Sequence, residues 1–218
     1  MKKWLAVFAV LIFACSSASA LEIPEVAPIT MRSVDSADDA VAYAKEVWQY
    51  DFIAGYRDNL NWKAELIAGN WEIYADDAET GERALSLAIR PDRRIVYLLN
   101  VESGARQACD AGTDAYDHDE ALLSDLEQFA IASFASLAPE VDANQLTLDS
   151  FREETNIGDS YFVDFWEPMP DGIEGKGNVH RHLYVQIAPE VRVTFWVDML
   201  LAPPSDVWER LEPNMGNG

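Results

Sequence analysis

Apolar residues recur along this chain with two different periods, and the changes between them predict the elements. Two segments have the three-and-four spacing of an amphipathic helix. The first begins with the capping pattern Ser36-Ala37-Asp38-Asp39, and the second runs from Asp117 to Leu137, before Pro139. Alternating polar and apolar residues predict strands after each helix. The expected strands cover 61–67, 70–76, 83–90 and 93–100 in the first half, and 145–152, 160–166, 181–188 and 191–198 in the second.

The second half of the chain repeats part of the first. Residues 84–100, ALSLAIRPDRRIVYLLN, align without gaps with residues 182–198, HLYVQIAPEVRVTFWVD. Both segments are typical of a β-hairpin, because two apolar strands flank a short turn with proline and an acid. In this alignment three apolar positions of the first strand match: Leu85, Leu87 and Ile89 with Leu183, Val185 and Ile187.

These patterns predict an α+β protein made of two tandem helix-plus-antiparallel-sheet units, each with one sheet face packed on its helix. We expect a first unit at 33–100, an acidic linker at 101–116 and a second unit at 117–200. An extended lead-in is expected at 21–32, and a short helix with a tail at 201–218. Leu85, Leu87 and Ile89 should face the helix residues Val41, Ala44 and Trp48, and Leu183, Val185 and Ile187 should face Leu126, Phe129 and Ala130.

Residues 1–20 have the organisation of a secretory signal peptide. Two lysines precede an apolar run from Trp4 to Ala14, which is too short for a stable transmembrane helix. Ala18-Ser19-Ala20 is a signal peptidase pattern, so cleavage before Leu21 predicts a periplasmic or secreted protein without a transmembrane span. Residues 12–15 also resemble a lipobox, and a lipid anchor at Cys15 is the alternative.

Charge changes the picture of possible partners. Loss of Lys2 and Lys3 with the leader leaves 14 basic residues against 38 acidic ones, a formal net charge of −24. Such a field repels phosphate backbones, which excludes nucleic acid, and favours cationic partners. With 49% hydrophobic residues the chain has enough apolar surface to fold.

The order of elements, a helix followed by a meander of four strands in an exported and duplicated chain, resembles PepSY-like domains and the wider cystatin-like group. The Thr-Gly turn that PepSY domains often carry is absent, and residues 90–93 (Arg-Pro-Asp-Arg) and 188–191 (Ala-Pro-Glu-Val) stand in its place. The resemblance implies a non-catalytic binding or inhibitory module outside the cytoplasm. It is a resemblance of element order, and function must be argued from a site.

Histidines offer one candidate for chemistry. His180 and His182 lie two apart on an expected strand, so they should share a face with Tyr184 and Gln186. A third ligand such as His118 would complete a transition-metal site. The other interpretation, a polar sheet face with solvated histidines, is favoured because only two ligands are visible. We therefore expect no bound metal, no cofactor and no catalytic residue, although enzymatic activity stays open.

Two arginines and a tryptophan are candidates for binding. Arg94 and Arg192 occupy matching hairpin positions, where they either receive an anionic group from a partner or pair with local carboxylates. Trp196 follows Arg192 and Thr194 at alternating positions, so it should share their face and mark an open sheet surface for association.

Two functional classes follow. The first is an exported, non-enzymatic binding or inhibitory module that recognises a peptide or partner protein through a sheet face or the groove between the two units. The second resembles the NTF2-like group, a small-molecule-binding or hydrolytic protein with a pocket between helix and sheet.

Overall fold

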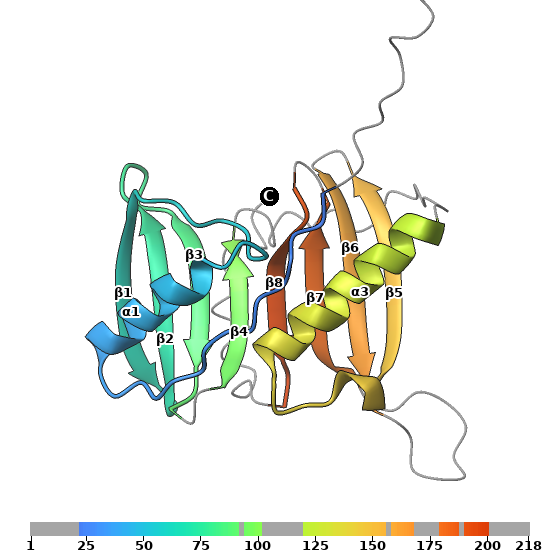
Figure 1. Ribbon diagram of the computed structural model, residues 1–218. Coiled ribbons are helices and arrows are strands. Elements are labelled where there is room, and N and C mark those ends of the chain that lie inside the picture. The colour runs from blue at the N-terminus through green and yellow to red at the C-terminus, as the bar shows by residue number, and fades with distance from the viewer. Residues whose placement is uncertain are drawn as a thin grey trace, which may run out of the picture.

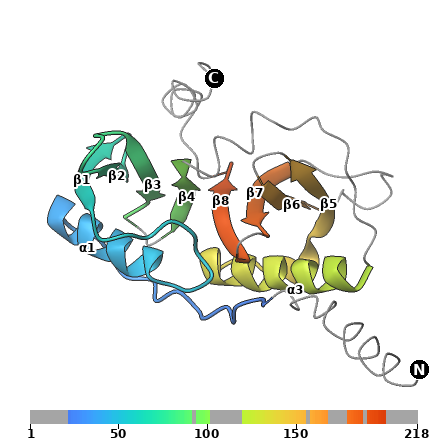
Figure 2. The same cartoon turned by 90° about the horizontal axis from the view of Figure 1, so that it is seen from above.

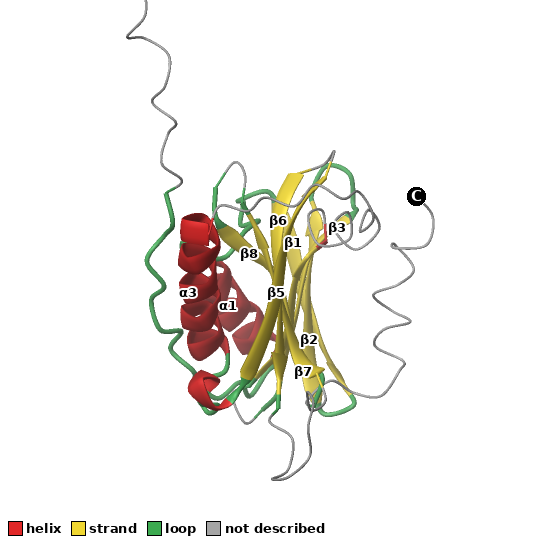
Figure 3. Cartoon of the chain, turned by 90° about the vertical axis from the view of Figure 1, so that its right-hand side faces the viewer, coloured by secondary structure: helices red, strands yellow, loops and turns green. Residues whose placement is uncertain are grey.

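The computed structural model describes residues 22–91, 94–101, 120–155, 158–167, 179–187 and 190–200. These residues form two layers, an eight-stranded antiparallel sheet and the helices α1 (Ala37–Trp48) and α3 (Glu120–Leu137) on one face of it (Figures 1 and 3). Seen from above, both helices lie on the same side of the strands (Figure 2). A 3-10 turn at Ala143–Gln145 follows α3. The predicted α+β class with an antiparallel sheet is confirmed.

All eight predicted strands form, with ends that differ from the predicted ones by no more than three residues. They are β1 (Leu60–Ile67), β2 (Asn70–Asp77), β3 (Arg83–Ile89), β4 (Ile95–Asn100), β5 (Thr147–Thr155), β6 (Gly158–Trp166), β7 (Val179–Gln186) and β8 (Arg192–Asp198). The order across the sheet is β1-β2-β3-β4-β8-β7-β6-β5. Each half of the chain therefore contributes a meander of four strands, and the last strand of each meander lies at the centre.

The sheet is one continuous unit. The strands β4 and β8 pair in an antiparallel ladder, in which Tyr97 lies opposite Val197, Leu98 opposite Trp196 and Leu99 opposite Phe195. One apolar cluster runs under both helices and across this junction, from Leu87 in the first half to Val163 in the second. Neither the sheet nor its core thus divides the chain into two separate tandem units.

Helix α1 begins where the capping pattern predicts. The Oγ of Ser36 accepts a hydrogen bond from the backbone N–H of Asp39 at 3.2 Å, which satisfies one of the free donors of the first turn. The buried stripe of the helix consists of Ala40, Tyr43, Ala44, Val47 and Trp48. Leu85, Leu87 and Ile89 belong with this stripe to the main cluster, and Val41 packs against it from a half-buried position.

Helix α3 covers the second meander in the same way. The residues Leu126, Phe129, Ala130, Leu183, Val185 and Ile187 are all buried in the main cluster, as predicted. Phe134 is the centre of this packing, since the centre of its ring lies 4.4 Å from the ring centre of Phe165 and 5.3 Å from that of Trp196. Burial of such rings removes large apolar areas from water and holds the helix on the sheet.

Sheet register corrects the gapless alignment of the two hairpins. Leu98 and Trp196 match in that alignment, and they lie opposite each other at the centre of the sheet. Leu98 pairs with Leu87, whereas Trp196 pairs with Leu183, so the register matches Leu87 with Leu183 and not with Val185. The shift is two residues. Because strand side chains alternate with period two, the predicted faces survive the error.

The lead-in ties the two halves together. It runs extended over the helical side of the sheet (Figure 1). The Oγ of Ser136 in α3 donates to the carbonyl of Ala27 at 2.9 Å and accepts from the backbone N–H of Ile29 at 3.0 Å. Farther along, the indole of Trp71 donates to the carbonyl of Val34 at 3.1 Å. The predicted leader 1–20 lies outside the described residues, as do most of the linker 101–116 and the tail 201–218.

Candidate functional site

The loop after α1 crosses from the first half to the central strand of the second. The backbone N–H of Ala54 donates to the carbonyl of Val193 at 2.8 Å, and that of Val193 donates to the carbonyl of Phe52 at 2.7 Å. Ile53 and Val193 form an isolated parallel bridge. The loop thereby lies beside the start of β8, where β4 has already ended at Asn100.

Gly55 allows the loop to leave β8 again. Its φ is +104°, a backbone conformation that strains a residue with a side chain. A Cβ atom at this position would come within 2.6 Å of Nδ2 of Asn100 and 2.9 Å of Cδ2 of Leu85. Glycine thus permits both the turn and the close approach of the loop to the ends of β3 and β4.

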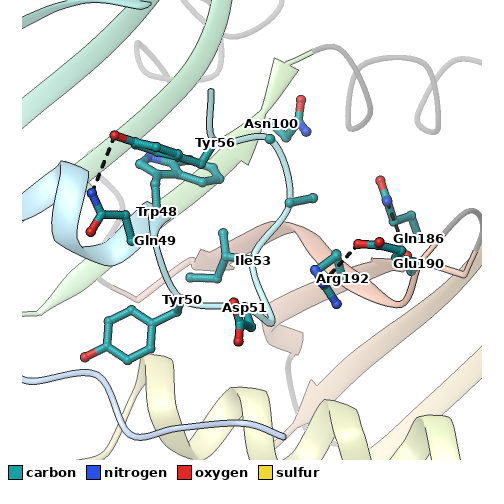
Figure 4. Close-up of a pocket in the computed structure, with 12 residues that line it drawn as sticks. Trp48, Gln49, Tyr50, Asp51, Ile53, Tyr56, Asn100, Gln186, Glu190 and Arg192 are labelled. Carbon is teal, nitrogen blue, oxygen red and sulfur yellow. Dashed lines mark hydrogen bonds and ion pairs between the residues drawn. The ribbon is translucent and has the colours of Figure 1, made fainter. Parts of the chain in front are cut away.

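Two neighbouring hollows lie along this crossing, and we call them together the seam groove. Figure 4 shows the residues that line the first of them. The first has a volume of about 390 Å³ and the second about 450 Å³. Asp51, Glu190 and Arg192 line both of them. The first is completed by Trp48, Gln49, Tyr50, Ile53, Ala54, Gly55, Tyr56, Asn100 and Gln186, and the second by Glu22, Ile23, Pro24 and Glu25. Each volume is in the range of small-ligand pockets.

The charge of the groove is negative. Nη2 of Arg192 forms an ion pair with Oε2 of Glu190 at 2.9 Å, and Nη1 donates to the carbonyl of Val191 at 3.0 Å. Glu22, Glu25 and Asp51 add three further carboxylates, and Arg192 is the single cation among the lining residues that the structure describes. A cationic group placed here is attracted by several carboxylates at short range.

Aromatic and amide side chains form the remaining wall. The hydroxyl of Tyr50 accepts a hydrogen bond from the backbone N–H of Thr30 at 3.1 Å, which fixes the ring. The hydroxyl of Tyr56 accepts from the amide of Gln49 at 3.5 Å, and the side chain is 38% exposed. The indole N–H of Trp48 is buried and has no hydrogen-bond partner among the described residues. Such a wall offers stacking surfaces and hydrogen-bond donors to an occupant.

The predicted arginines lie at opposite ends of the central strand pair. Each begins or precedes a central strand, and each contacts a carboxylate: Nε of Arg94 lies 3.6 Å from Oε1 of Glu140, and Arg192 pairs with Glu190. Glu190 is a local carboxylate of the kind that the sequence suggested, whereas Glu140 comes from the other half of the chain. Only Arg192 lines the seam groove.

Of the two predicted histidines, His182 lies on the sheet face away from the helices. Its Nδ1 is 2.7 Å from Oδ1 of Asp164 on the neighbouring strand β6. Val179 pairs with Trp166 and Arg181 with Phe165, so His180 is the extra residue of a bulge between β6 and β7. Strict alternation, on which the shared face of the two histidines rested, does not extend through a bulge.

A metal site through these histidines finds no third ligand in the described ranges. Within those ranges, no group of three histidine, cysteine, aspartate or glutamate side chains lies close enough to hold an ion. His118 and the side chain of His180 lie outside the description.

Tyr184 belongs to an aromatic row on the same outer face. Its ring centre lies 4.7 Å from that of Phe162 and 4.8 Å from that of Phe195. Burial raises the pKa of the Tyr184 hydroxyl, and the negative charge of Asp164 adds to this effect. The tyrosine is thus a packed, neutral side chain, and it is not among the residues that line the seam groove.

The prediction for Trp196 is wrong. Its side chain lies in the main core on the helical side, fully buried, and its indole donates to the carbonyl of Ile95 at 3.4 Å. The register shifts between Tyr184 and Val185, which leaves Thr194 as an extra residue of β8. This bulge reverses the alternation, so Trp196 does not share the face of Arg192 and does not mark an open surface.

Sequence reasoning missed most of the groove. The lining residues Gln49, Asp51, Tyr56, Asn100, Gln186 and Glu190 were not candidates. One signal was present: residues 50–56, YDFIAGY, are too apolar for an exposed loop between a helix and a strand. The identity of the strand that such a loop contacts depends on the fold.

Comparisons with protein-family models, with curated proteins and with solved structures give no match. Among the described residues, no helix has the length and apolar character that spanning a membrane requires. The chemistry of the site therefore has to be argued from the geometry of this chain.

Proposed function

We propose that this chain is an exported, non-enzymatic binding module that recognises a peptide or a partner protein through the seam groove. The observation that supports this proposal is the groove itself, a hollow to which both halves contribute side chains. Its walls consist of carboxylates, amides, phenols, a guanidinium and an indole, which recognise ligands by charge and hydrogen bonds.

We propose further that the chain consists of two tandem units, as the resemblance to PepSY-like and cystatin-like domains implies. Register shifts occur at matching places, between β2 and β3 as between β6 and β7, and between β3 and β4 as between β7 and β8. The alignment that matches Leu98 with Trp196 also matches Tyr97 with Phe195 and Leu99 with Val197. When the two halves are interchanged, the Tyr97–Val197 pair therefore becomes the Leu99–Phe195 pair. This is the relation expected of a two-fold contact between equal partners.

The NTF2-like alternative needs a pocket between helix and sheet. In the described residues that interface is occupied by the continuous apolar cluster, with Leu87, Phe134 and Trp196 fully buried within it. The two hollows of the seam groove lie at its border, and they favour the binding module.

The test is selection of peptides from a random display library on the mature protein, followed by mapping of a selected peptide on ¹⁵N-labelled protein by NMR. We expect chemical-shift changes to concentrate in residues 48–56, 100 and 186–192. Perturbation confined to the outer sheet face around Tyr184 and His182 would move the proposed site there, and failure to select any binder would refute the proposal.

Export is tested separately. The leader predicts that the protein recovered outside the cytoplasm begins at Leu21, because signal peptidase accepts small residues at Ala18 and Ala20. Intact mass spectrometry of that material measures this directly. A mass that fits lipidation at Cys15 would instead show a membrane-anchored protein.

A further inference from the structure

We infer that the seam groove selects a basic segment of extended peptide, with a lysine or arginine side chain placed between Asp51 and its neighbouring carboxylates. This inference rests on the proposed function and names the chemistry of its ligand.

The first argument is the state of the charges in the groove. The guanidinium of Arg192 is already neutralised by Glu190, and it also binds the carbonyl of Val191. Asp51, Glu22 and Glu25 form no ion pair among the described residues. An anionic ligand would meet three unpaired carboxylates and one occupied arginine, whereas a cation would gain from all of them.

The second argument compares the two ends of the central strand pair. Arg94 stands at the position that matches Arg192, and it is paired with Glu140 from the loop after α3. Asp51 occupies the same place after α1 as Glu140 does after α3, three residues beyond the end of the helix. Yet Arg192 pairs with Glu190, so the carboxylate of Asp51 lines the groove without an ion pair among the described residues.

A buried ion pair at the Arg94 end of the central strand pair strengthens this comparison. Nε of Arg181 lies 3.0 Å from Oδ2 of Asp198, and both side chains are almost fully buried. The matching residues at the groove end are the neutral pair Leu85 and Asn100, next to Gly55. At one end charged side chains thus satisfy each other, whereas the other end has a hollow with unpaired acids on its wall.

The third argument is the buried indole. Trp48 lines the first hollow, and its N–H has no acceptor among the described residues. A buried donor without a partner is unusual in a folded protein. A peptide offers carbonyl acceptors along its backbone in addition to a cationic side chain, whereas a simple polyamine offers only the cations. Tyr50 and Tyr56 add aromatic faces on which a lysine or arginine side chain can lie.

The experiment uses the mature protein and three labelled eight-residue peptides with blocked ends, in which threonine alternates with lysine, glutamine or glutamate. Fluorescence anisotropy at physiological salt measures their affinities, because low salt would exaggerate unspecific attraction to this acidic protein. We expect the lysine peptide to bind at least about tenfold more tightly than the other two.

Matched variants separate the groove from the overall charge. Asp51→Lys and Glu79→Lys change the net charge equally, and Glu79 is exposed in the turn between β2 and β3, away from the groove. We expect Asp51→Lys to weaken binding of the lysine peptide by about tenfold or more and Glu79→Lys by less than about twofold. Circular dichroism of both variants checks that the fold is retained.

Several outcomes would overturn the inference. Equal effects of the two variants would assign the attraction to the overall charge, and tighter binding of the glutamate peptide would reverse the chemistry. If spermine, added at the same concentration of charge, competes with the lysine peptide and binds as tightly, the peptide backbone has no role in recognition. If library selection maps neutral or acidic peptides to the groove, only this inference fails. If no peptide of any charge binds there, the proposed function fails with it.

Discussion

At the scale of single residues, the most constrained position of the groove is Gly55. The residue combines a positive φ with close approach to Asn100 and Leu85, and it follows directly on the residues that pair with β8. Gly55 allows one loop to form backbone hydrogen bonds with β8 and then to turn away and form the wall of a hollow.

Replacement of Gly55 by alanine should therefore destabilise the protein more than the same change at Gly69. At Gly69 φ is also positive, +86°, but a Cβ atom would meet nothing within 4 Å. We expect a loss of about 1 kcal/mol for Gly69→Ala and about 2–3 kcal/mol for Gly55→Ala, because only the latter adds a clash to the backbone strain. Urea denaturation measures both, and equal losses would contradict the close approach.

Acid stability should depend on Asp77 in the turn after β2. Its Oδ1 accepts the backbone N–H groups of Thr80 and Glu79, at 2.9 and 2.8 Å, and these bonds hold the pKa of the carboxyl below its ordinary value. Arg57 and Asn59 add to the effect. The contribution of Asp77 is fully present above the unfolded-state pKa of about 3.9 and is lost as the pH falls through the lower folded-state pKa.

The variant Asp77→Asn, which cannot titrate, should accordingly be less stable than the natural protein at pH 7 and close to it in strongly acidic solution. Urea denaturation at pH 7 and at decreasing pH below about 4 measures the difference. Asp58→Asn is the control, since Asp58 is exposed in a turn and has no interaction of this kind. A difference that stays constant with pH would contradict the argument.

At the scale of elements, local sequence signals place the helices and strands with good accuracy. Caps, apolar stripes and alternation act within a few residues, so they can be recognised without knowledge of the fold. The bulges are different. Those at Val96, Thr194 and His180 depend on how a strand pairs with its neighbour. They changed the face of Trp196 and interrupted the strict alternation on which the predicted shared face of His180 and His182 rested.

The cap of α1 gives a test at this scale. Ser36→Ala should lower the free energy of unfolding by about 1 kcal/mol, because the N–H of Asp39 loses its acceptor. Ser36→Asn keeps an acceptor at the same place and should retain most of the stability. Thermal or urea unfolding of the two variants measures this, and equal behaviour would show that the cap contributes nothing.

At the scale of the whole molecule, the two halves form one sheet and share one core. The ladder between β4 and β8, the loop at residues 52–54 beside β8, and the lead-in on α3 all cross the middle. Free energy gained in these contacts is lost if either half unfolds, which couples the halves.

We therefore expect a single cooperative unfolding transition in urea. Leu87→Ala in the first half and Leu183→Ala in the second each remove a fully buried side chain, at a cost of about 2–5 kcal/mol. Each variant should shift the same single transition, seen both by tryptophan fluorescence and by circular dichroism. Two separate transitions, with each variant moving only one, would show that the units fold independently.

The amino-acid sequence by itself determined the elements, their order and which face of most strands is apolar, because these properties follow from the spacing of residues within single segments. It also showed the excess of acids and the weakness of any metal or catalytic pattern. Among the predicted binding residues whose side chains the structure describes, only Arg192 lines the groove, and it could be named because it stands in a recognisable hairpin.

The tertiary structure decided how the two meanders meet, which side chains the bulges turn inward, and where a hollow remains. The ladder between Leu98 and Trp196 and the crossing of Ile53 to Val193 join residues far apart in the chain. Such contacts are selected by the packing of both helices on one sheet, and no local pattern specifies them. Asp51 became a candidate for binding only because that packing leaves its carboxylate at the groove and pairs Arg192 with Glu190 instead.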